Sequence, residues 1–174
     1  MDLDKAKEMA IQAHLGQKYG LHPYEKHLQD VQDVLERFEL LPEVYTDLFI
    51  AAWLHDAVED TSITIEQVIG EFGQMVGNIV NAVTNEPGFN RADRFNKTAN
   101  KIIKNPWFIV LKLADKIANT EESSVNDNPS LYKMYIKEYP IFREKLYTMS
   151  TDNSVPFSTI EAMWNHLDNI SKGC

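Results

Sequence analysis

The sequence predicts an all-α protein, a multi-helix bundle of about eight to ten helices, because apolar residues recur at helical intervals along most of the chain. No segment shows the alternating pattern of a half-buried strand. The length of 174 residues and the hydrophobic content of 44% are typical of one domain with one core. We therefore expect one domain over residues 1–174, in which residues 122–174 form C-terminal packing helices.

The first half of the chain contains four expected helices. The first spans residues 2–15 and the second 24–39, with a loop over 16–23 between them. The third is expected from Pro42 to Asp60, because proline is common at the first helical position. Thr64–Gln67 has the pattern of a capping box, which opens a fourth helix ending near Gly73.

Turn residues divide the second half of the chain into five further expected helices. The breaks are the N-E-P-G-F-N segment at 85–90, Asn105 with Pro106, and the polar loop at 123–130. A second capping box is expected at Ser158–Glu161. The five helices are expected over Val76–Val83, 91–104, 107–121, Leu131–Met149 and Thr159–Ile170.

Composition excludes several classes of function. The net charge of −9 and the pI near 5.0 argue against a nucleic-acid or membrane-surface binder, since such binding depends on Lys and Arg. The single cysteine, Cys174, excludes an internal disulfide and suits a reducing cytoplasm. Without an apolar signal core or a long apolar run, a cytoplasmic protein is expected. The oligomeric state is left open, and a homodimer is compatible with the sequence.

The segment W-L-H-D-A-V-E-D-T at 53–61 places polar groups at the end of an apolar, buried helix. At 100° per residue, Glu59, Asp56 and Asp60 fall within about 140° of His55, so all four are expected on one face. Buried carboxylates must be paired, neutralised or bound to a metal. The segment therefore indicates a metal or catalytic site.

Two buried polar residues elsewhere are candidate partners for His55 and Asp56. His27 shares an apolar stripe with Val31, and Asp115 is flanked by apolar residues on a later helix. Two imidazoles and two carboxylates suit Mn, Fe, Co or Zn better than Ca. Four protein ligands leave a position for water at a five- or six-coordinate ion, which favours phosphoester hydrolysis.

Four motifs carry a resemblance to a known family. They are P-Y-E-K-H at 23–27, L-H-D-A-V-E-D-T at 54–61, T-I-E-Q-V-I-G-E-F-G at 64–73 and K-L-A-D-K-I-A-N at 112–119. Together they resemble the HD-domain metal phosphohydrolases over about residues 5–120, and most closely the alarmone hydrolase domain of the RelA/SpoT family. The resemblance thus implies an HD-domain helical bundle.

The resemblance also implies roles for individual residues. It assigns one divalent metal, usually Mn²⁺, to His27, His55, Asp56 and Asp115. It implies that Glu59 and Asp60 position or activate the attacking water. Both residues lie one turn further along the expected helix than His55 and Asp56, which also suits proton transfer. It places Asn119 on the substrate side of the site.

The basic segment 91–116 indicates an anionic substrate, since it has seven cations against two acids, a local net charge of +5. Arg94 and Lys97 are the candidate contacts, although a solvated helix face would have the same spacing. In the loop before Pro23, the family usually has Q-x-R-K-x-G, whereas this chain has Q-K-Y-G-L-H. Lys18 is retained as a candidate phosphate contact, and Tyr19 is expected to stack on the base.

The function implied is that of a guanosine 3′,5′-bis(diphosphate) 3′-pyrophosphohydrolase with a small-molecule nucleotide substrate. Two alternatives stay open. One is an HD phosphohydrolase acting on another nucleotide or phosphoester. The other is a non-catalytic nucleotide- or protein-binding module, which would not need the buried cluster of acids.

Overall fold

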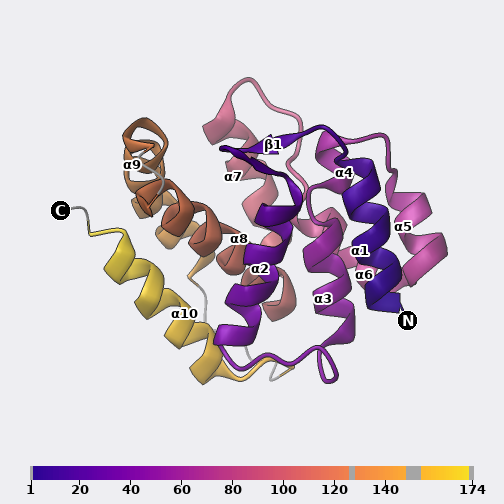
Figure 1. Cartoon of the computed structure of the whole chain (residues 1–174). Coiled ribbons are helices and arrows are strands. Elements are labelled where there is room, and N and C mark those ends of the chain that lie inside the picture. The colour runs from indigo at the N-terminus through magenta and orange to yellow at the C-terminus, as the bar shows by residue number, and fades with distance from the viewer. Residues whose placement is uncertain (1, 126–127, 148–153, 173–174) are drawn as a thin grey trace.

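The computed structural model describes residues 2–125, 128–147 and 154–172, and within these ranges the chain is almost entirely helical (Figure 1). The all-α prediction is confirmed. Met149 and Cys174 lie outside the described residues. The helices are α1 Asp2–Ala13, α2 Glu25–Arg37, α3 Thr46–Leu54, α4 Ala57–Asp60, α5 Ile65–Phe72, α6 Gln74–Val83, α7 Arg91–Ile102, α8 Pro106–Val125, α9 Pro129–Leu146 and α10 Phe157–Ile170.

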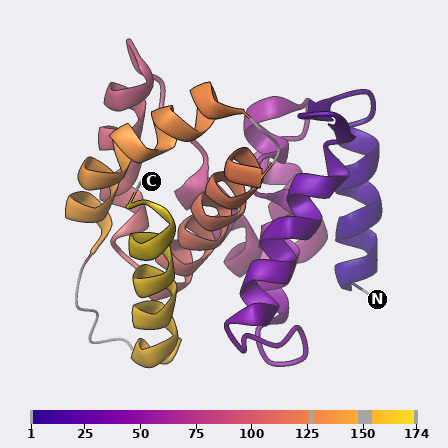
Figure 2. The ribbon, with the colours of Figure 1, turned by 60° about the vertical axis from the view of Figure 1, so that its left-hand side comes forward.

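Helix α8 is the central element of the bundle. It contacts α2, α3 and α6 in the first part of the chain, and α7, α9 and α10 in the second. Figure 2 shows α9 and α10 covering α8 on one side, with α1 to α3 on the other. Leu111, Leu113 and Ile117 are fully buried, as expected for a helix that has neighbours on several sides.

The expected third helix is shorter than predicted and is divided. It begins at Thr46 rather than Pro42, because residues 41–45 form turns in which Tyr45 N donates to Leu41 O at 2.9 Å. It ends at Leu54, and α4 starts only at Ala57. Asp56 has φ −97° and ψ −9°, which interrupts the regular helix. His55, Asp56, Glu59 and Asp60 therefore do not belong to one continuous helix.

The two predicted capping boxes have different outcomes. Thr64 Oγ1 accepts from Gln67 N at 3.4 Å while Thr64 N donates to Gln67 Oε1 at 2.8 Å, so the first box is confirmed. The second box is wrong, since α10 begins at Phe157 and places Ser158 inside the first turn. Its N-cap residue is Pro156, whose side chain has no acceptor oxygen.

The predicted loop at 16–23 contains a small hairpin. Strands β1, Lys18–Tyr19, and β2, His22–Pro23, pair antiparallel, with Tyr19 opposite His22. Gly20 has φ +59°, a left-handed conformation that glycine adopts readily. Strands of two residues are too short to be recognised by an alternation of apolar and polar residues in the sequence. Among the described residues, no helix combines the length and apolarity that crossing a membrane requires.

Candidate functional site

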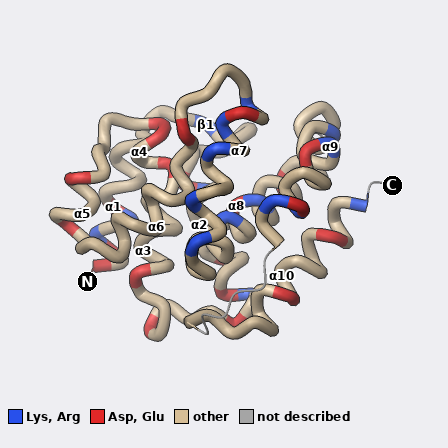
Figure 3. The backbone as a smooth tube through the Cα atoms, turned by 180° about the vertical axis from the view of Figure 1, so that it is seen from behind, with Lys and Arg blue, Asp and Glu red and all other residues tan. Residues whose placement is uncertain are grey.

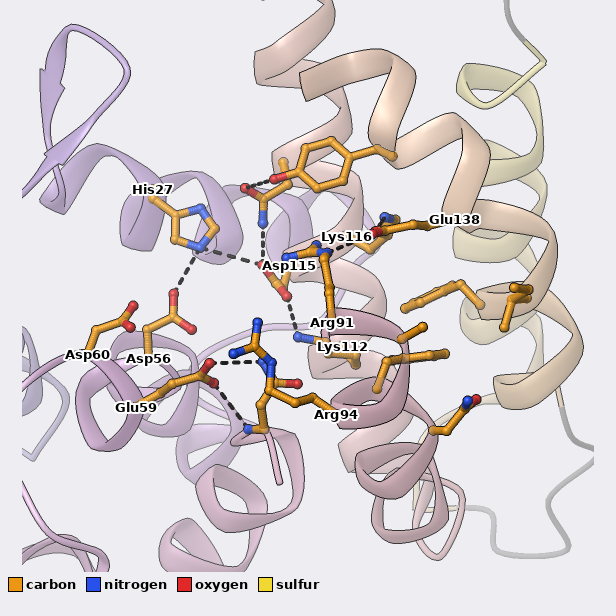
Figure 4. A pocket seen from close by; sticks show the side chains of 18 of the residues that line it. His27, Asp56, Glu59, Asp60, Arg91, Arg94, Lys112, Asp115, Lys116 and Glu138 are labelled. Carbon is orange, nitrogen blue, oxygen red and sulfur yellow. Dashed lines mark hydrogen bonds and ion pairs between the residues drawn. The ribbon is translucent and has the colours of Figure 1, made fainter. Parts of the chain in front are cut away.

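Four predicted side chains converge at one point between α2, α8 and the turn joining α3 to α4. His27 Nε2 lies 3.3 Å from His55 Nε2, 3.4 Å from Asp56 Oδ2 and 3.5 Å from Asp115 Oδ1. His55 Nε2 lies 3.1 Å from Asp56 Oδ2 and 3.9 Å from Asp115 Oδ1. Figure 4 shows His27, Asp56 and Asp115 directed toward one another.

His27, His55 and Asp115 could hold a single divalent metal ion, and Asp56, which contacts both histidines, is the candidate fourth ligand. Donor atoms that share an ion at about 2.0–2.2 Å lie about 3 Å apart when they are at right angles, close to the distances seen here. Ligand atoms of His27, His55 and Asp115, all buried, lie within 4.8 Å of one another. The Nδ1 atom of His55 is 2.7 Å from Ala52 O, so it donates there and leaves Nε2 free to bind a metal.

Neighbouring side chains hold both carboxylates of this set. Tyr24 donates from its hydroxyl to Asp56 Oδ2 at 2.5 Å. Asp115 accepts from Asn119 Nδ2 at 2.5 Å on Oδ1 and from Lys112 Nζ at 2.7 Å on Oδ2. These roles of Tyr24 and Lys112 were not predicted from the sequence. The helical spacing of Lys112 and Asp115, three residues apart, was an available signal for one of them.

Charge pairing shifts the pKa values of the set. Burial alone would raise the pKa of Asp56, but His55 and His27 lower it well below its usual range. Burial alone would lower the pKa of His55, but Asp56 raises it to about 9. Lys112 and His55 lower the pKa of Asp115 against the opposing effect of burial. In the absence of a metal, a protonated His55 therefore balances part of the negative charge of the two carboxylates.

Glu59 and Asp60 lie in α4, beside the four-residue set, and both line the same pocket. The Glu59 carboxylate accepts from Asn85 N at 3.1 Å and from Asn85 Nδ2 at 3.0 Å, contacts the sequence did not indicate. Burial, Asp56 and Glu59 raise the pKa of Asp60. A carboxylate with a raised pKa next to a metal-binding set is suited to proton transfer.

His14 supports this region from α1's C-terminal end. Its ring stacks on Tyr24 with centroids 4.4 Å apart, and its Nδ1 lies 2.8 Å from Gln17 Oε1. Gln17 Nε2 in turn donates to Asp60 O at 2.9 Å. The buried Nε2 of His14 has no hydrogen-bond partner among the described residues. His14 thus connects the hairpin loop to both Tyr24 and α4.

A pocket of about 300 Å³ opens from the metal-binding set toward α7 and α9. Its far wall is cationic, with an acid among the cations (Figure 4). The aromatic residues Phe95, Tyr135 and Phe142 also line the pocket. Helices α7 and α8, which pack against each other, both carry basic residues in the middle of the view in Figure 3. The charged residues of the wall are Arg91, Arg94, Lys116 and Glu138, while Lys112 lines the pocket beside Asp115.

Lys116 is the most buried cation of this wall. Its Nζ lies 4.3 Å from the centre of the Tyr135 ring and 5.6 Å from that of Phe142. Burial lowers the pKa of Lys116 to about 8, although Glu138 and Asp115 raise it. The basic segment 91–116 thus supplies Arg91 and Lys116 to this wall, in addition to the predicted Arg94.

The predicted substrate contacts differ in position. Asn119 and Arg94 line the pocket, but Lys18, Tyr19 and Lys97 do not. Lys97 is paired with Asp93 Oδ2 at 3.0 Å and donates to Pro87 O at 2.9 Å. The Tyr19 hydroxyl donates to Asn119 Oδ1 at 3.1 Å, and its ring packs 4.8 Å from that of His27. Tyr19 is thus engaged with the site's own side chains.

The fold is a helical bundle with a candidate metal-binding set at its centre, and comparison with known proteins gives the relatives. No family model matches the chain. A probable GTP pyrophosphokinase of Mycobacterium leprae is 32% identical over 123 residues, 67% of this chain and 15% of that protein. A guanosine-3′,5′-bis(diphosphate) 3′-pyrophosphohydrolase of Borreliella burgdorferi is 33% identical over 123 residues, 66% of this chain and 18% of that protein.

A shorter relative and two solved structures extend the comparison. The Drosophila melanogaster 3′-pyrophosphohydrolase MESH1 is 32% identical over 107 residues, 60% of this chain and 58% of that protein. A metazoan orthologue of SpoT that hydrolyses ppGpp has the same fold, with a TM-score of 0.74, 21% identity and 94% of each chain covered. A Listeria monocytogenes protein has a TM-score of 0.62 and 22% identity, over 90% of this chain and 100% of its own.

These matches agree with the motifs on which the resemblance rests. The chain is a relative of the HD-domain alarmone hydrolases of the RelA/SpoT family. It spans 15% and 18% of the two bacterial relatives and 58% of the fly protein.

Proposed function

We propose that this protein is a metal-dependent guanosine 3′,5′-bis(diphosphate) 3′-pyrophosphohydrolase. The observation that carries the proposal is one pocket with two chemically different ends. One end gathers two histidines and two carboxylates next to Glu59 and Asp60, and the other presents the side chains of Arg91, Arg94 and Lys116. Such a pocket can hold the phosphates of a nucleotide and direct water to one of them.

In this proposal His27, His55, Asp56 and Asp115 hold one divalent ion, Mn²⁺. When bound, the ion supplies the Lewis acidity that polarises a phosphoryl oxygen and lowers the pKa of water. Tyr24 orients the Asp56 carboxylate, and Lys112 orients that of Asp115. Both contacts reduce the motion of the donor atoms.

The other residues act on water and phosphate. Glu59, held by Asn85, orients the attacking water, and Asp60 accepts its proton. Attack on the 3′-pyrophosphate breaks the bond between the 3′ oxygen and phosphorus, releasing pyrophosphate and GDP from ppGpp. Arg91, Arg94 and Lys116 stabilise the negative charge on the phosphates. Asn119 contacts the substrate from the pocket wall, whereas Lys18 and Lys97 lie outside the lining of the pocket.

The proposal is tested by incubating the full chain with Mn²⁺ and ppGpp and separating the products by chromatography. Release of GDP and pyrophosphate that stops when the metal is chelated is the expected result. The same panel includes nucleoside mono- and triphosphates and an adenine analogue of ppGpp. Intact ppGpp with cleavage of a simple nucleotide would replace the alarmone assignment with that of another HD phosphohydrolase.

A substitution at Glu59 separates chemistry from metal binding. Glu59 is hydrogen-bonded to Asn85 and is not one of the four proposed metal ligands. The variant Glu59→Gln should therefore retain the bound metal. Turnover should fall about 10² to 10⁴-fold, as for other lost acid–base groups. Metal content is measured by atomic absorption on the same sample. Unchanged turnover would limit Glu59 to a structural contact with Asn85.

A further inference from the structure

Glu138 differs from the other acids that line the pocket. Those acids lie in or beside the metal-binding set, at the end formed by α4 and α8, whereas Glu138 comes from α9 and stands in the cationic wall. In Figure 4 it is beside Lys116 and on the opposite side of the pocket from Glu59 and Asp60. The metal-binding set and the proposed water activation do not use its charge.

The Glu138 carboxylate contacts two cations from different helices. Its Oε1 accepts from Arg91 Nε at 2.7 Å, and its Oε2 lies 3.8 Å from Lys116 Nζ. Both cations also lie over the Tyr135 ring, at 6.0 Å for Arg91 and 4.3 Å for Lys116. One carboxylate therefore bridges α7 and α8 in the position where two cations could receive a phosphate group.

The other two cations that line the pocket, Lys112 and Arg94, are not contacted by Glu138. Lys112 is bonded to Asp115, at the metal-binding end. Arg94 is exposed, and its guanidinium has no hydrogen bond or ion pair among the described residues. A phosphate-rich ligand that uses Arg91 and Lys116 must therefore displace or repel Glu138. With 34% of its side chain exposed, Glu138 can rotate toward solvent without unfolding α9.

We propose that Glu138 is an internal competitor for Arg91 and Lys116, which sets how much negative charge a ligand needs to occupy this pocket. A ligand with one phosphate offers little more charge than the carboxylate it displaces, whereas a diphosphate group contacts both cations with several charged oxygens. Glu138 thereby selects diphosphate-containing ligands over monophosphates. The inference deepens the proposed function, and rests on it for the identity of the natural ligand.

Calorimetric titration of the full chain with inorganic phosphate, pyrophosphate and tripolyphosphate tests this selection without turnover. No metal is added, so that metal–pyrophosphate complexes do not form. Because pyrophosphate and tripolyphosphate already displace the carboxylate whereas phosphate has to share the cations with it, Glu138→Gln should tighten phosphate binding about tenfold, with smaller gains for pyrophosphate and tripolyphosphate. Glu138→Asp keeps the charge and should bind all three ligands like the unchanged protein.

Glu144→Gln is the matched control, because it makes the same change in net charge at an exposed position of α9 outside the pocket. It should leave all three affinities unchanged. Weaker pyrophosphate binding by Glu138→Gln would show that Glu138 holds the cations in place rather than competing for them. Equal gains for all three ligands, or for Glu144→Gln, would overturn the selection. Failure of ppGpp hydrolysis would leave these binding results unaffected.

Discussion

At the scale of single residues, His55 has a separate partner for each ring nitrogen. Nδ1 lies 2.7 Å from Ala52 O, while Nε2 faces Asp56 Oδ2 at 3.1 Å. The ring is buried, so its charge is favoured only because Asp56 is adjacent. His55 would have to lose the proton on Nε2 in order to hold a metal there, so metal binding would be linked to pH.

Metal affinity should rise with pH over the range in which His55 loses its proton. Asp56 raises the pKa of His55 to about 9, so a metal binding at neutral pH must displace about one proton. Affinity should then increase about tenfold per pH unit up to pH 9 and level off above it. Titration calorimetry with Mn²⁺ in buffers of different ionisation enthalpy measures the proton released. Affinity that is independent of pH between 6 and 8 would contradict this linkage.

The ionised carboxylate of Asp60 should lower the free energy of unfolding of the metal-free protein at neutral pH. Burial and the charges of Asp56 and Glu59 raise its pKa, so its ionised form is less favourable in the folded state than in the unfolded chain. The stability that protonated Asp60 contributes is present below the usual pKa of 3.8 and is lost as pH rises through the raised value.

Accordingly, Asp60→Asn should increase the free energy of unfolding at pH 7, and this gain should shrink as the pH falls toward 4. Urea unfolding of the chelator-treated protein across this pH range measures the effect. Glu144→Gln, which removes an exposed charge far from the cluster, should show no such gain. A destabilised Asp60→Asn at pH 7 would mean that the carboxylate is paired rather than repelled.

At the scale of elements, the corner between α5 and α6 combines local signals with a close packing contact. The Thr64 capping box opens α5, and Gly73 ends it with φ +89°, a conformation that suits glycine. Gly77 then places α6 against Ile69. A Cβ atom added at Gly77 would lie 2.3 Å from Ile69 Cγ1, so this position has no room for a side chain.

Two glycine substitutions should therefore have opposite effects. Gly77→Ala should lower the free energy of unfolding by about 1–3 kcal/mol through overpacking, despite the higher helix propensity of alanine. Gly70→Ala, within α5, meets no atom within 4 Å and should raise it by about 0.5–1 kcal/mol. Urea denaturation of both variants measures the difference. Equal effects would show that α6 shifts to accommodate the methyl group.

At the scale of the whole molecule, the packing around α8 joins the two parts of the chain. Helices α2 and α3 contact one side of α8, and helices α9 and α10 contact another side, as Figures 1 and 2 show. Phe142 of α9 and Trp164 of α10 are buried and lie 5.8 Å apart between ring centroids. The described residues of α9 and α10 thus contribute to the core, and we propose that residues 1–174 form one domain.

A single domain should unfold in one cooperative transition. Trp53 in α3 and Trp164 in α10 are buried on different sides of α8 and report on the two parts separately. In variants in which Trp53 or Trp164 is the only tryptophan, Trp107 being replaced as well, fluorescence and far-ultraviolet circular dichroism should give the same urea midpoint. Separate midpoints for Trp164 and for circular dichroism would indicate that the C-terminal helices unfold as their own unit.

The sequence by itself determined most of the helical organisation and the residues gathered at the metal-binding end. Apolar periodicity predicted the helices, and Thr64 and Gly73 defined the limits of α5, because these signals are carried by residues close together in the chain. His27, His55, Asp56 and Asp115 could be selected because each is a polar group on an apolar segment, where burial without a partner is costly.

Only the tertiary structure decided which of the other polar groups meet. Periodicity gives the face of a helix but not the neighbour of that face, so the pairing of Glu138 with Arg91 and the engagement of Tyr19 with Asn119 could not be predicted. The interruption at Asp56 was missed because its backbone departs only slightly from helical values. Contacts between residues far apart in the chain depend on how helices pack around α8, and this packing divides the pocket between metal-binding and cationic ends.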